Sequence, residues 1–135
     1  MRVVLDTNVI IAAFAARGLC AEVYEVCLAN HTIVMSEHIL SEVERNLAKK
    51  IRLPRSVTYS AINYLREISE IFEPELVKIP ECRDKDDIKI IGTALSGGAD
   101  IIITGDDDLL VLKSFAKVKI LTPREFWDIL RSGRT

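Results

Sequence analysis

The sequence predicts one α/β domain in which helices pack against a mostly parallel sheet of four or five strands. Short β-branched runs alternate with segments of helical periodicity, which is the element order expected of a parallel sheet. The 135 residues suit a single domain with a sizeable core, and neither a linker nor an internal repeat divides them. Hydrophobic residues make up 49% of the chain and charged residues 28%, a composition typical of a folded globular protein.

Four runs of the sequence are predicted strands, and a fifth run is ambiguous. "MRVVLD" and "IIIT" are apolar and β-branched, as strands that are buried on both faces tend to be. "HTIVMS" and "KVKILT" are two further candidates. "ELVKIP", residues 75–80, is either a fifth strand or an extended connector. The four predicted strands cover residues 1–6, 31–36, 101–104 and 117–122.

Helical periodicity occupies the segments between these strands. The first helical segment is broken near Gly18, and the fourth stops at the glycine pair Gly97 and Gly98, a helix C-terminal signal. The last helix, "PREFWDILR", opens at Pro123, because proline is favoured in the first turn of a helix. The predicted helices cover residues 8–29, 36–50, 57–71, 84–95 and 123–131.

The overall charge and the cysteines restrict the class of protein. The formal net charge is −2, so any nucleic acid would have to be held by a local basic patch. No apolar run approaches the ~20 residues of a membrane span, and the N-terminus lacks the layout of a signal peptide. Cys20, Cys27 and Cys82 match no metal or disulfide spacing. We therefore expect a cytoplasmic protein with free thiols and no membrane segment.

Acidic residues follow the ends of two predicted strands. Asp6 ends the first strand in "LDTNVI", and Asp106 opens the acidic run "DDD" just beyond "IIIT". Ligands bind open parallel sheets at the carboxyl ends of the strands, so both carboxylates are expected at one edge of the sheet. Glu42 in "ILSEVERNL" and Asp87 in "CRDKDDIKIIGTAL" would add to them from two helices.

Such a convergence of acids requires protons or a cation. Two carboxylates about 5 Å apart repel by roughly 3 kcal/mol at an effective dielectric constant near 20. Four ionised acids would cost on the order of 10 kcal/mol, which rivals the stability of a domain. Oxygen ligands without cysteine or histidine suit a hard ion, Mg²⁺ or Mn²⁺, better than zinc. His31 opens a strand and His38 lies in the first turn of a helix, so both are expected to be structural or surface residues.

In this order, the motifs resemble the PIN domain, and within it the VapC-type toxins of toxin–antitoxin pairs. The resemblance rests on "VVLDTNVII", "ILSEVERNL", "CRDKDDIKIIGTALSGGADIIITGDDDLL" and "KILTPREFW". It spans nearly the whole chain, although residues 53–80 carry no distinguishing motif. It implies a three-layer α/β/α PIN-like fold formed by residues 1–135 as a single domain. It also implies a ribonuclease whose acidic pocket binds Mg²⁺ or Mn²⁺.

The resemblance assigns a role to each acidic residue of the motifs. It implies that Asp6, Glu42, Asp87 and Asp106 are catalytic, and that Asp108 joins Asp6, Asp87 and Asp106 as a metal ligand. By the same resemblance, Asn8 and Thr104 are polar residues that line the pocket and position the carboxylates.

Several alternatives stay open from the sequence. The chain has "RDKDDI" where "RDPDDD" is common in the family, so Asp84 and Asp86 are alternatives to Asp87. Asp84 is expected mainly as the cap of its helix, and Asp107 is expected to face solvent. Asp6 could instead serve only as a helix N-cap. Glu42 could be a solvated surface residue, in which case the acid from this helix would be Glu37 or Glu44.

A carboxylate-bound hard cation predicts phosphoryl chemistry by metal-activated water, leaving 5′-phosphate and 3′-hydroxyl ends, and the resemblance implies single-stranded RNA as the substrate. The alternative is a non-catalytic PIN-like module that binds RNA or protein. A phosphatase with an aspartate nucleophile is disfavoured, because Asn8 stands where its second acid would be. One basic stretch could hold RNA, or it could be a solvated helix end. Its residues are Arg45, Lys49, Lys50, Arg52 and Arg55, with Arg83 and Lys113 as weaker candidates elsewhere.

Two protein partners follow from the resemblance. A toxin of this type would bind an antitoxin chain, and the family implies a homodimer. The apolar run from Ile10 to Cys27 either supplies a dimer surface or forms ordinary core.

Overall fold

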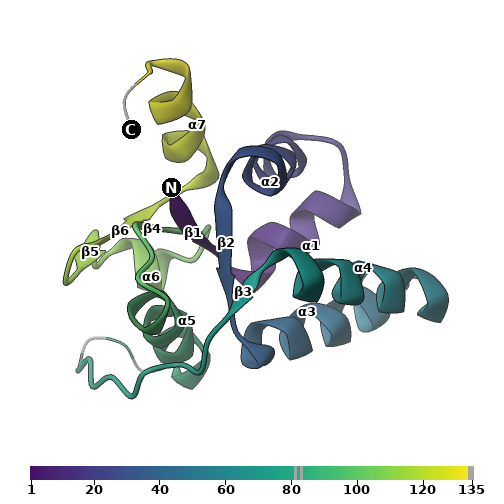
Figure 1. Ribbon diagram of the computed structural model, residues 1–135, viewed down its shortest axis with the longest axis horizontal. Helices are drawn as coiled ribbons and strands as arrows, with labels where there is room; N and C mark the ends of the chain where they lie inside the picture. Colours follow the sequence, from purple (N-terminus) through teal and green to yellow (C-terminus); the bar gives the residue numbers. More distant parts are fainter. Residues whose placement is uncertain (81, 83, 134–135) are drawn as a thin grey trace.

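A six-stranded sheet forms the centre of the protein in the computed structural model, which describes residues 1–80, 82 and 84–133 (Figure 1). The strand order is β3-β2-β1-β4-β6-β5, and only the β5–β6 pair is antiparallel. The strands are β1 (Arg2–Leu5), β2 (Thr32–Met35), β3 (Glu70–Ile71), β4 (Ile101–Ile103), β5 (Ser114–Phe115) and β6 (Val118–Leu121).

All four strands predicted from sequence are present, as β1, β2, β4 and β6. The ambiguous run at residues 75–80 is an extended connector, so its interpretation as a strand was wrong. The sheet also gains two edge strands that were not predicted, β3 and β5, of two residues each. Two residues are too few to show a periodicity, and these strands are defined by their pairing with a neighbour.

Each predicted helix is present, and the break at Gly18 separates α1 from α2. The helix predicted over residues 57–71 ends at Ile68, because Glu70 and Ile71 pair with β2 as strand β3. The helices are α1 (Thr7–Ala15), α2 (Leu19–Asn30), α3 (Glu37–Lys49), α4 (Arg55–Ile68), α5 (Lys85–Ser96), α6 (Asp107–Leu110) and α7 (Pro123–Arg131). The single turn α6 was not predicted. Within the described residues, no helix has both the length and the apolar character needed to cross a lipid bilayer.

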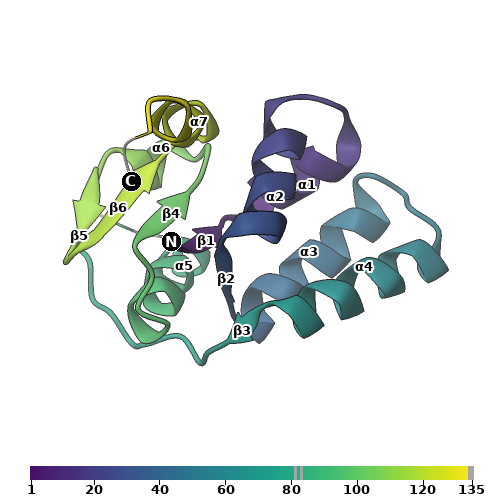
Figure 2. The ribbon, with the colours of Figure 1, turned by 45° about the horizontal axis from the view of Figure 1, so that its top comes forward.

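Helices cover both faces of the sheet, as the predicted three-layer architecture requires. Helix α5 packs against β1, β2 and β4, whereas α2 packs against β2 and α7 (Figure 2). Helices α3 and α4 pack side by side and extend away from the sheet in both views. The Ile10–Cys27 run contributes mainly to the core, because Ile10, Val23 and Cys27 are fully buried.

The sheet topology places the ends of β1 and β4 together. From β1 the chain moves outward through β2 to β3, and then α5 returns it across the sheet to β4, on the other side of β1. The strand order therefore reverses between β1 and β4, which is where open α/β sheets bind ligands. Leu5 is in register with Ile103, so Asp6 and Thr104 leave the sheet at the same edge.

Candidate metal centre

An acidic cavity of about 180 Å³ lies at this edge of the sheet. It is formed by residues from the ends of β1 and β4 and from helices α3 and α5. All four acids predicted to be catalytic line it, although they are up to 100 positions apart in the chain. The lining residues are Asp6, Thr7, Asn8, His38, Glu42, Asn46, Lys50, Asp84, Asp86, Asp87, Ile90 and Asp106.

Thr104 connects the two strand ends through its hydroxyl group. Its Oγ1 donates a hydrogen bond of 2.6 Å to Asp6 Oδ2 and accepts one of 3.0 Å from the backbone N–H of Asp106. Thr104 is fully buried. The Asp6 side chain forms no N-cap hydrogen bond to α1, so the alternative that Asp6 serves only as a cap was wrong. Thr104 was predicted to line the pocket and position its carboxylates; it is hydrogen-bonded to Asp6 but does not itself line the cavity.

Asp87 lies in the pocket close to Asp106 and Asp108. Its side chain is buried, and Oδ2 has no hydrogen-bond partner among the described residues. One ligand atom from each of Asp87, Asp106 and Asp108 lies within 4.8 Å of the other two. Burial, reinforced by the negative charge of Asp106, raises the pKa of Asp87 to about 7. The carboxylate is therefore placed to bind either a proton or a cation.

Burial also raises the pKa of Asp6, and the hydrogen bond from Thr104 opposes this shift. The pKa of Glu42 is raised by burial and then by the nearby charge of Asp86. Raised carboxylate pKa values in three parts of one cavity show that its negative charges are poorly compensated by the protein alone.

The three acids at the start of α5 have different positions. Asp84 is the N-cap and accepts a 2.8 Å hydrogen bond from the N–H of Asp86, as expected for a cap. Asp86 is half exposed and pairs with His38, whose Nε2 lies 3.0 Å from Asp86 Oδ1. Only Asp87 is buried against Asp106. Asp84 and Asp86 line the same cavity, but Asp87 is the one of the three acids that is grouped with Asp106 and Asp108.

Helix α3 contributes Glu42, together with a histidine that sequence analysis missed. His38 Nε2 lies 3.6 Å from Glu42 Oε1, and His38, Glu42 and Asp86 form a second group of closely spaced potential ligands. His38 was expected to be a structural or surface residue; the structure places it half-buried at the cavity, beside Glu42 and Asp86. Its four-residue spacing from Glu42, which puts both on one helix face, was the available signal.

The two alternatives to Glu42 on α3 do not line the cavity. Glu37 is exposed and pairs with Arg66 at 2.8 Å, and Glu44 is exposed to solvent. Glu42 is the acid of this helix that the structure brings to the pocket.

The three aspartates that follow β4, Asp106 to Asp108, lie in different environments. Asp106 is the N-cap of α6 and accepts a 2.9 Å hydrogen bond from the N–H of Asp108. Asp107 is exposed, as expected. Asp108 is exposed too, yet its carboxylate reaches the group formed with Asp87 and Asp106. Asn8 is exposed at the mouth of the cavity and forms part of its lining.

Comparison with known families identifies the domain. A family model described as the PIN domain matches residues 2–108, which is most of the chain. The chain belongs to the PIN domain family. The resemblance inferred from the sequence motifs is thereby confirmed, and the matched region contains every acid of the pocket.

Solved structures with the same fold are toxin–antitoxin proteins. One is VapBC2 from Rickettsia felis, in a structure bound to a DNA fragment from their promoter. It matches with a TM-score of 0.59 and 16% sequence identity, and the match covers 90% of this chain and 98% of that chain. VapBC-1 from nontypeable Haemophilus influenzae matches with a TM-score of 0.61 and 21% identity over 92% and 99%. At these identities the likeness establishes the fold. A search of curated proteins gave no significant match.

The basic stretch of this PIN domain reaches the pocket at two residues. Lys50 lines the cavity, and an Arg45 nitrogen lies 3.4 Å from Glu42 Oε1. The other predicted RNA-binding residues, Lys49, Arg52 and Arg55, are exposed and do not line the cavity. Arg83, named as a weaker candidate, lies outside the described residues.

The donor set of the PIN domain pocket fits a hard divalent cation. The buried and unpartnered Asp87 Oδ2 faces carboxylates rather than a lysine or arginine among the described residues, and oxygen ligands predominate around it. Oxygen ligands of this kind suit hard divalent cations better than zinc. His38, Glu42 and Asp86 form one group of potential ligands. Asp87, Asp106 and Asp108 form another, separate group.

Proposed function

We propose that this protein is a Mg²⁺- or Mn²⁺-dependent endoribonuclease that cleaves single-stranded RNA in the cytoplasm. One observation carries the proposal: carboxylates from four separate elements meet in one cavity around the buried, unpartnered Asp87 Oδ2. Carboxylate-bound hard cations with open coordination positions are suited to phosphodiester hydrolysis. PIN domain membership supports the same class of activity.

The geometry suggests a division of roles within the pocket. Asp6, Asp87 and Asp106 would hold the ion, with Asp108 completing the ligands. A bound ion would supply Lewis acidity, which lowers the pKa of water and offsets negative charge on the phosphate. Glu42, on the α3 side of the cavity, would orient the attacking water and accept its proton.

Two further residues would support these roles without touching the phosphate. Thr104 fixes the Asp6 carboxylate relative to the Asp106 backbone through its two hydrogen bonds. Asn8 would orient groups at the mouth of the cavity.

Substitution of the acids tests the proposal. Asp6→Asn and Asp106→Asn should each abolish cleavage of a single-stranded RNA in Mn²⁺ while the circular dichroism spectrum stays that of the wild type. Asp107→Asn is the matched control, because Asp107 is exposed and outside the pocket, and should leave the rate unchanged. Cleavage by Asp6→Asn at the wild-type rate would refute the mechanism. Wild-type protein that binds RNA without cutting it would instead support a non-catalytic module.

We also propose that the protein is the toxin of a toxin–antitoxin pair. The two structural neighbours are VapBC proteins by name. One face of helix α4 exposes apolar side chains to solvent. Val57 is 46%, Tyr64 50% and Ile68 38% exposed, and Ala61 between them is half buried. This spacing puts the four residues on one face, which suits an apolar helix of a partner chain.

Binding of the antitoxin encoded by a neighbouring gene would test this assignment. Tyr64→Asp should weaken the complex by at least about tenfold, because it places a charge in the apolar contact. Tyr59→Asp is the matched control, since Tyr59 is 64% exposed on another face of α4. Equal affinities of the two variants would exclude the apolar face of α4 as the antitoxin surface.

A second copy of the chain is the remaining proposed partner. Shallow cavities between α2 and α7 border Trp127, whose half-buried side chain offers apolar area for self-association. Analytical ultracentrifugation of the protein alone should give the mass of a homodimer. A monomeric mass at micromolar concentration would exclude it.

A further inference from the structure

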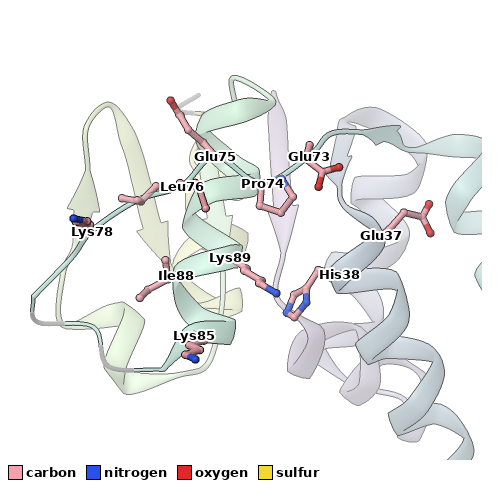
Figure 3. A pocket seen from close by; sticks show the side chains of 11 residues that line it. Glu37, His38, Glu73, Pro74, Glu75, Leu76, Lys78, Lys85, Ile88 and Lys89 are labelled. Carbon is pink, nitrogen blue, oxygen red and sulfur yellow. The ribbon is translucent and has the colours of Figure 1, made fainter.

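A second and larger cavity, of about 590 Å³, adjoins the acidic pocket (Figure 3). It lies between α5 and residues 72–80, which follow β3 and which we call the connector. We call this cavity the connector groove. His38 lines both the connector groove and the acidic pocket. The two cavities are therefore neighbours, and a chain-like ligand in the acidic pocket could continue into the groove.

The floor of the connector groove is apolar. Pro74 and Val77 line it from the connector, and Ile88 lines it from α5. Leu76 stands at its edge with 99% of its surface exposed, the most exposed large hydrophobic side chain in the described part of the protein. A leucine held entirely in water gains from burial by a ligand.

A backbone hydrogen bond holds the connector against α5, so the groove exists before a ligand binds. The N–H of Glu75 donates a 3.0 Å hydrogen bond to the carbonyl of Gly92. A Cβ atom at Gly92 would lie only 2.3 Å from the Glu75 carbonyl oxygen, so only glycine allows this approach. A preformed cavity avoids part of the ordering cost that binding would otherwise carry.

The charges around the connector groove are unevenly arranged. Lys85 and Lys89 on α5 have no ion-pair partner among the described residues, and Lys89 extends across the groove toward His38 in Figure 3. The Glu75 carboxylate points away from both lysines in the same view. The α5 side of the groove thus presents cations directly beside an acidic pocket.

Two acids and one more lysine complete the rim of the groove. Glu37 is neutralised by its 2.8 Å pair with Arg66, and Glu73 lies toward the α3 side. Lys78 adds a third cation from the connector. Cations therefore prevail on the side formed by α5 and the end of the connector.

We propose that the connector groove binds the nucleoside adjoining the scissile phosphate of single-stranded RNA, an inference that rests on the proposed ribonuclease function. The base would lie against the apolar floor and Leu76, and Lys85 and Lys89 would contact the adjoining phosphates from the α5 side of the groove. A nucleobase combines apolar faces with polar edges, and single strands are held by base contacts together with backbone contacts to cations. An apolar peptide would use the floor but would leave the two lysines without a counter-charge.

Binding of a fluorescein-labelled single-stranded RNA decamer, measured by anisotropy with Ca²⁺ in place of Mg²⁺, tests the inference separately from cleavage. Leu76→Ser should weaken binding roughly fivefold, because the base loses apolar contact. The same variant should bind an abasic decamer, which keeps the phosphates, as the wild type does. Leu76 is fully exposed, so this substitution removes no packing from the fold.

The lysines are tested with the double variant Lys85→Ala/Lys89→Ala. It should weaken both decamers, and the slope of log Kd against log salt should fall by about 1.4, since each contact to a single strand accounts for about 0.7. The matched control is Lys117→Ala/Lys119→Ala, which removes two exposed lysines from β6 and its preceding turn. The control should bind both decamers as the wild type does.

Each result separates one hypothesis from another. Wild-type affinity of Leu76→Ser for the RNA decamer would overturn the base contact, and so would an equal loss on the abasic decamer. Weaker binding of an antitoxin by Leu76→Ser, with RNA binding unchanged, would show a protein-docking groove and overturn the proposal. RNA binding that depends on Leu76 without any cleavage in Mn²⁺ would support the groove and refute the ribonuclease. Absence of RNA binding by the wild type would overturn both.

Discussion

A single hydroxyl group determines how Asp6 and Asp106 sit relative to each other. Thr104→Val keeps the side-chain volume but removes both hydrogen bonds of Thr104. We expect the free energy of unfolding to fall by about 1–3 kcal/mol, because the partly buried N–H of Asp106 and the buried carboxylate of Asp6 each lose a partner. Mn²⁺ affinity should fall by roughly tenfold, as is common when a group that orients a metal ligand is lost. Urea denaturation and titration calorimetry measure the two effects.

Thr58→Val is the control for this substitution. Thr58 is also buried, but its hydroxyl has no hydrogen-bond partner in the described structure. Its replacement should leave Mn²⁺ affinity unchanged and should not destabilise the fold. Identical behaviour of the two variants would show that the Thr104 hydrogen bonds do not organise the site.

The buried Asp87 carboxyl makes the stability of the ion-free protein depend on pH. Burial raises the pKa of Asp87 from 3.8 to about 7, so the folded state binds a proton that the unfolded state releases. Stability should therefore decrease as pH rises from about 4 to about 7. One pKa unit corresponds to about 1.4 kcal/mol and solvent at the pocket mouth screens part of the charge, so we expect a loss of about 2 kcal/mol.

Thermal unfolding in the presence of a chelator measures this dependence. Asp87→Asn should be more stable than the wild type at pH 8 and should show a flatter profile between pH 4 and 7. Asp107→Asn, which changes an exposed carboxylate, should keep the wild-type slope. A wild-type slope in Asp87→Asn would assign the pH dependence to another group.

The pocket acids could be located from sequence because strand ends and helix motifs specify them locally. Asp6 directly follows one buried apolar run and Asp106 follows another after Thr104 and Gly105, so the edge of the sheet where they meet was predictable. His38 was missed because its contact with Asp86, 48 positions away, depends on how α3 is rotated against α5. The local spacing shows only that His38 and Glu42 share one face of α3, and it does not show that this face meets Asp86.

Helix α3 connects the acidic pocket to the basic stretch. It carries Glu42 into the cavity, and its C-cap residue Lys50 lines the same cavity. Lys50→Glu should therefore weaken binding of single-stranded RNA by about tenfold and lower the salt slope by more than about 0.7, through loss of a phosphate contact and added repulsion. Anisotropy titrations at several salt concentrations measure both quantities.

Lys49→Glu provides the comparison for Lys50→Glu, because Lys49 is exposed one residue earlier and does not line the cavity. It changes the net charge equally, so only position separates the two variants. A larger loss of RNA binding in Lys49→Glu than in Lys50→Glu would place the RNA path elsewhere on α3.

The length of a helix or strand decided whether the sequence could predict it. Helices α3, α5 and α7 have long apolar stripes and clear end signals, such as the Thr122–Glu125 capping box of α7. Strands β3 and β5 and the single turn α6 are too short for any periodicity. Their conformation is imposed by tertiary contacts, as for β3, which pairs with β2 at the edge of the sheet.

The whole protein should gain stability from ion binding, because the cation relieves repulsion that exists only in the folded state. At a free Mn²⁺ concentration one hundred times the Kd, the gain should be about 2.7 kcal/mol, measured as a rise in Tm of the chelator-treated protein. Asp106→Asn should show a smaller rise, and Asp107→Asn the full rise. No rise in the wild type at millimolar Mn²⁺ would argue against a cation site in the pocket.

The order in which the chain is synthesised has a consequence for when this pocket can exist. Asp6 is made almost first, but its partner Thr104 and the neighbouring Asp106 belong to the last third of the sequence. Strand β4, which brings them to Asp6, lies between β1 and β6 and can pair fully only after β6 has been translated. A nascent chain therefore cannot complete the carboxylate cluster until β4 and β6 have both been translated.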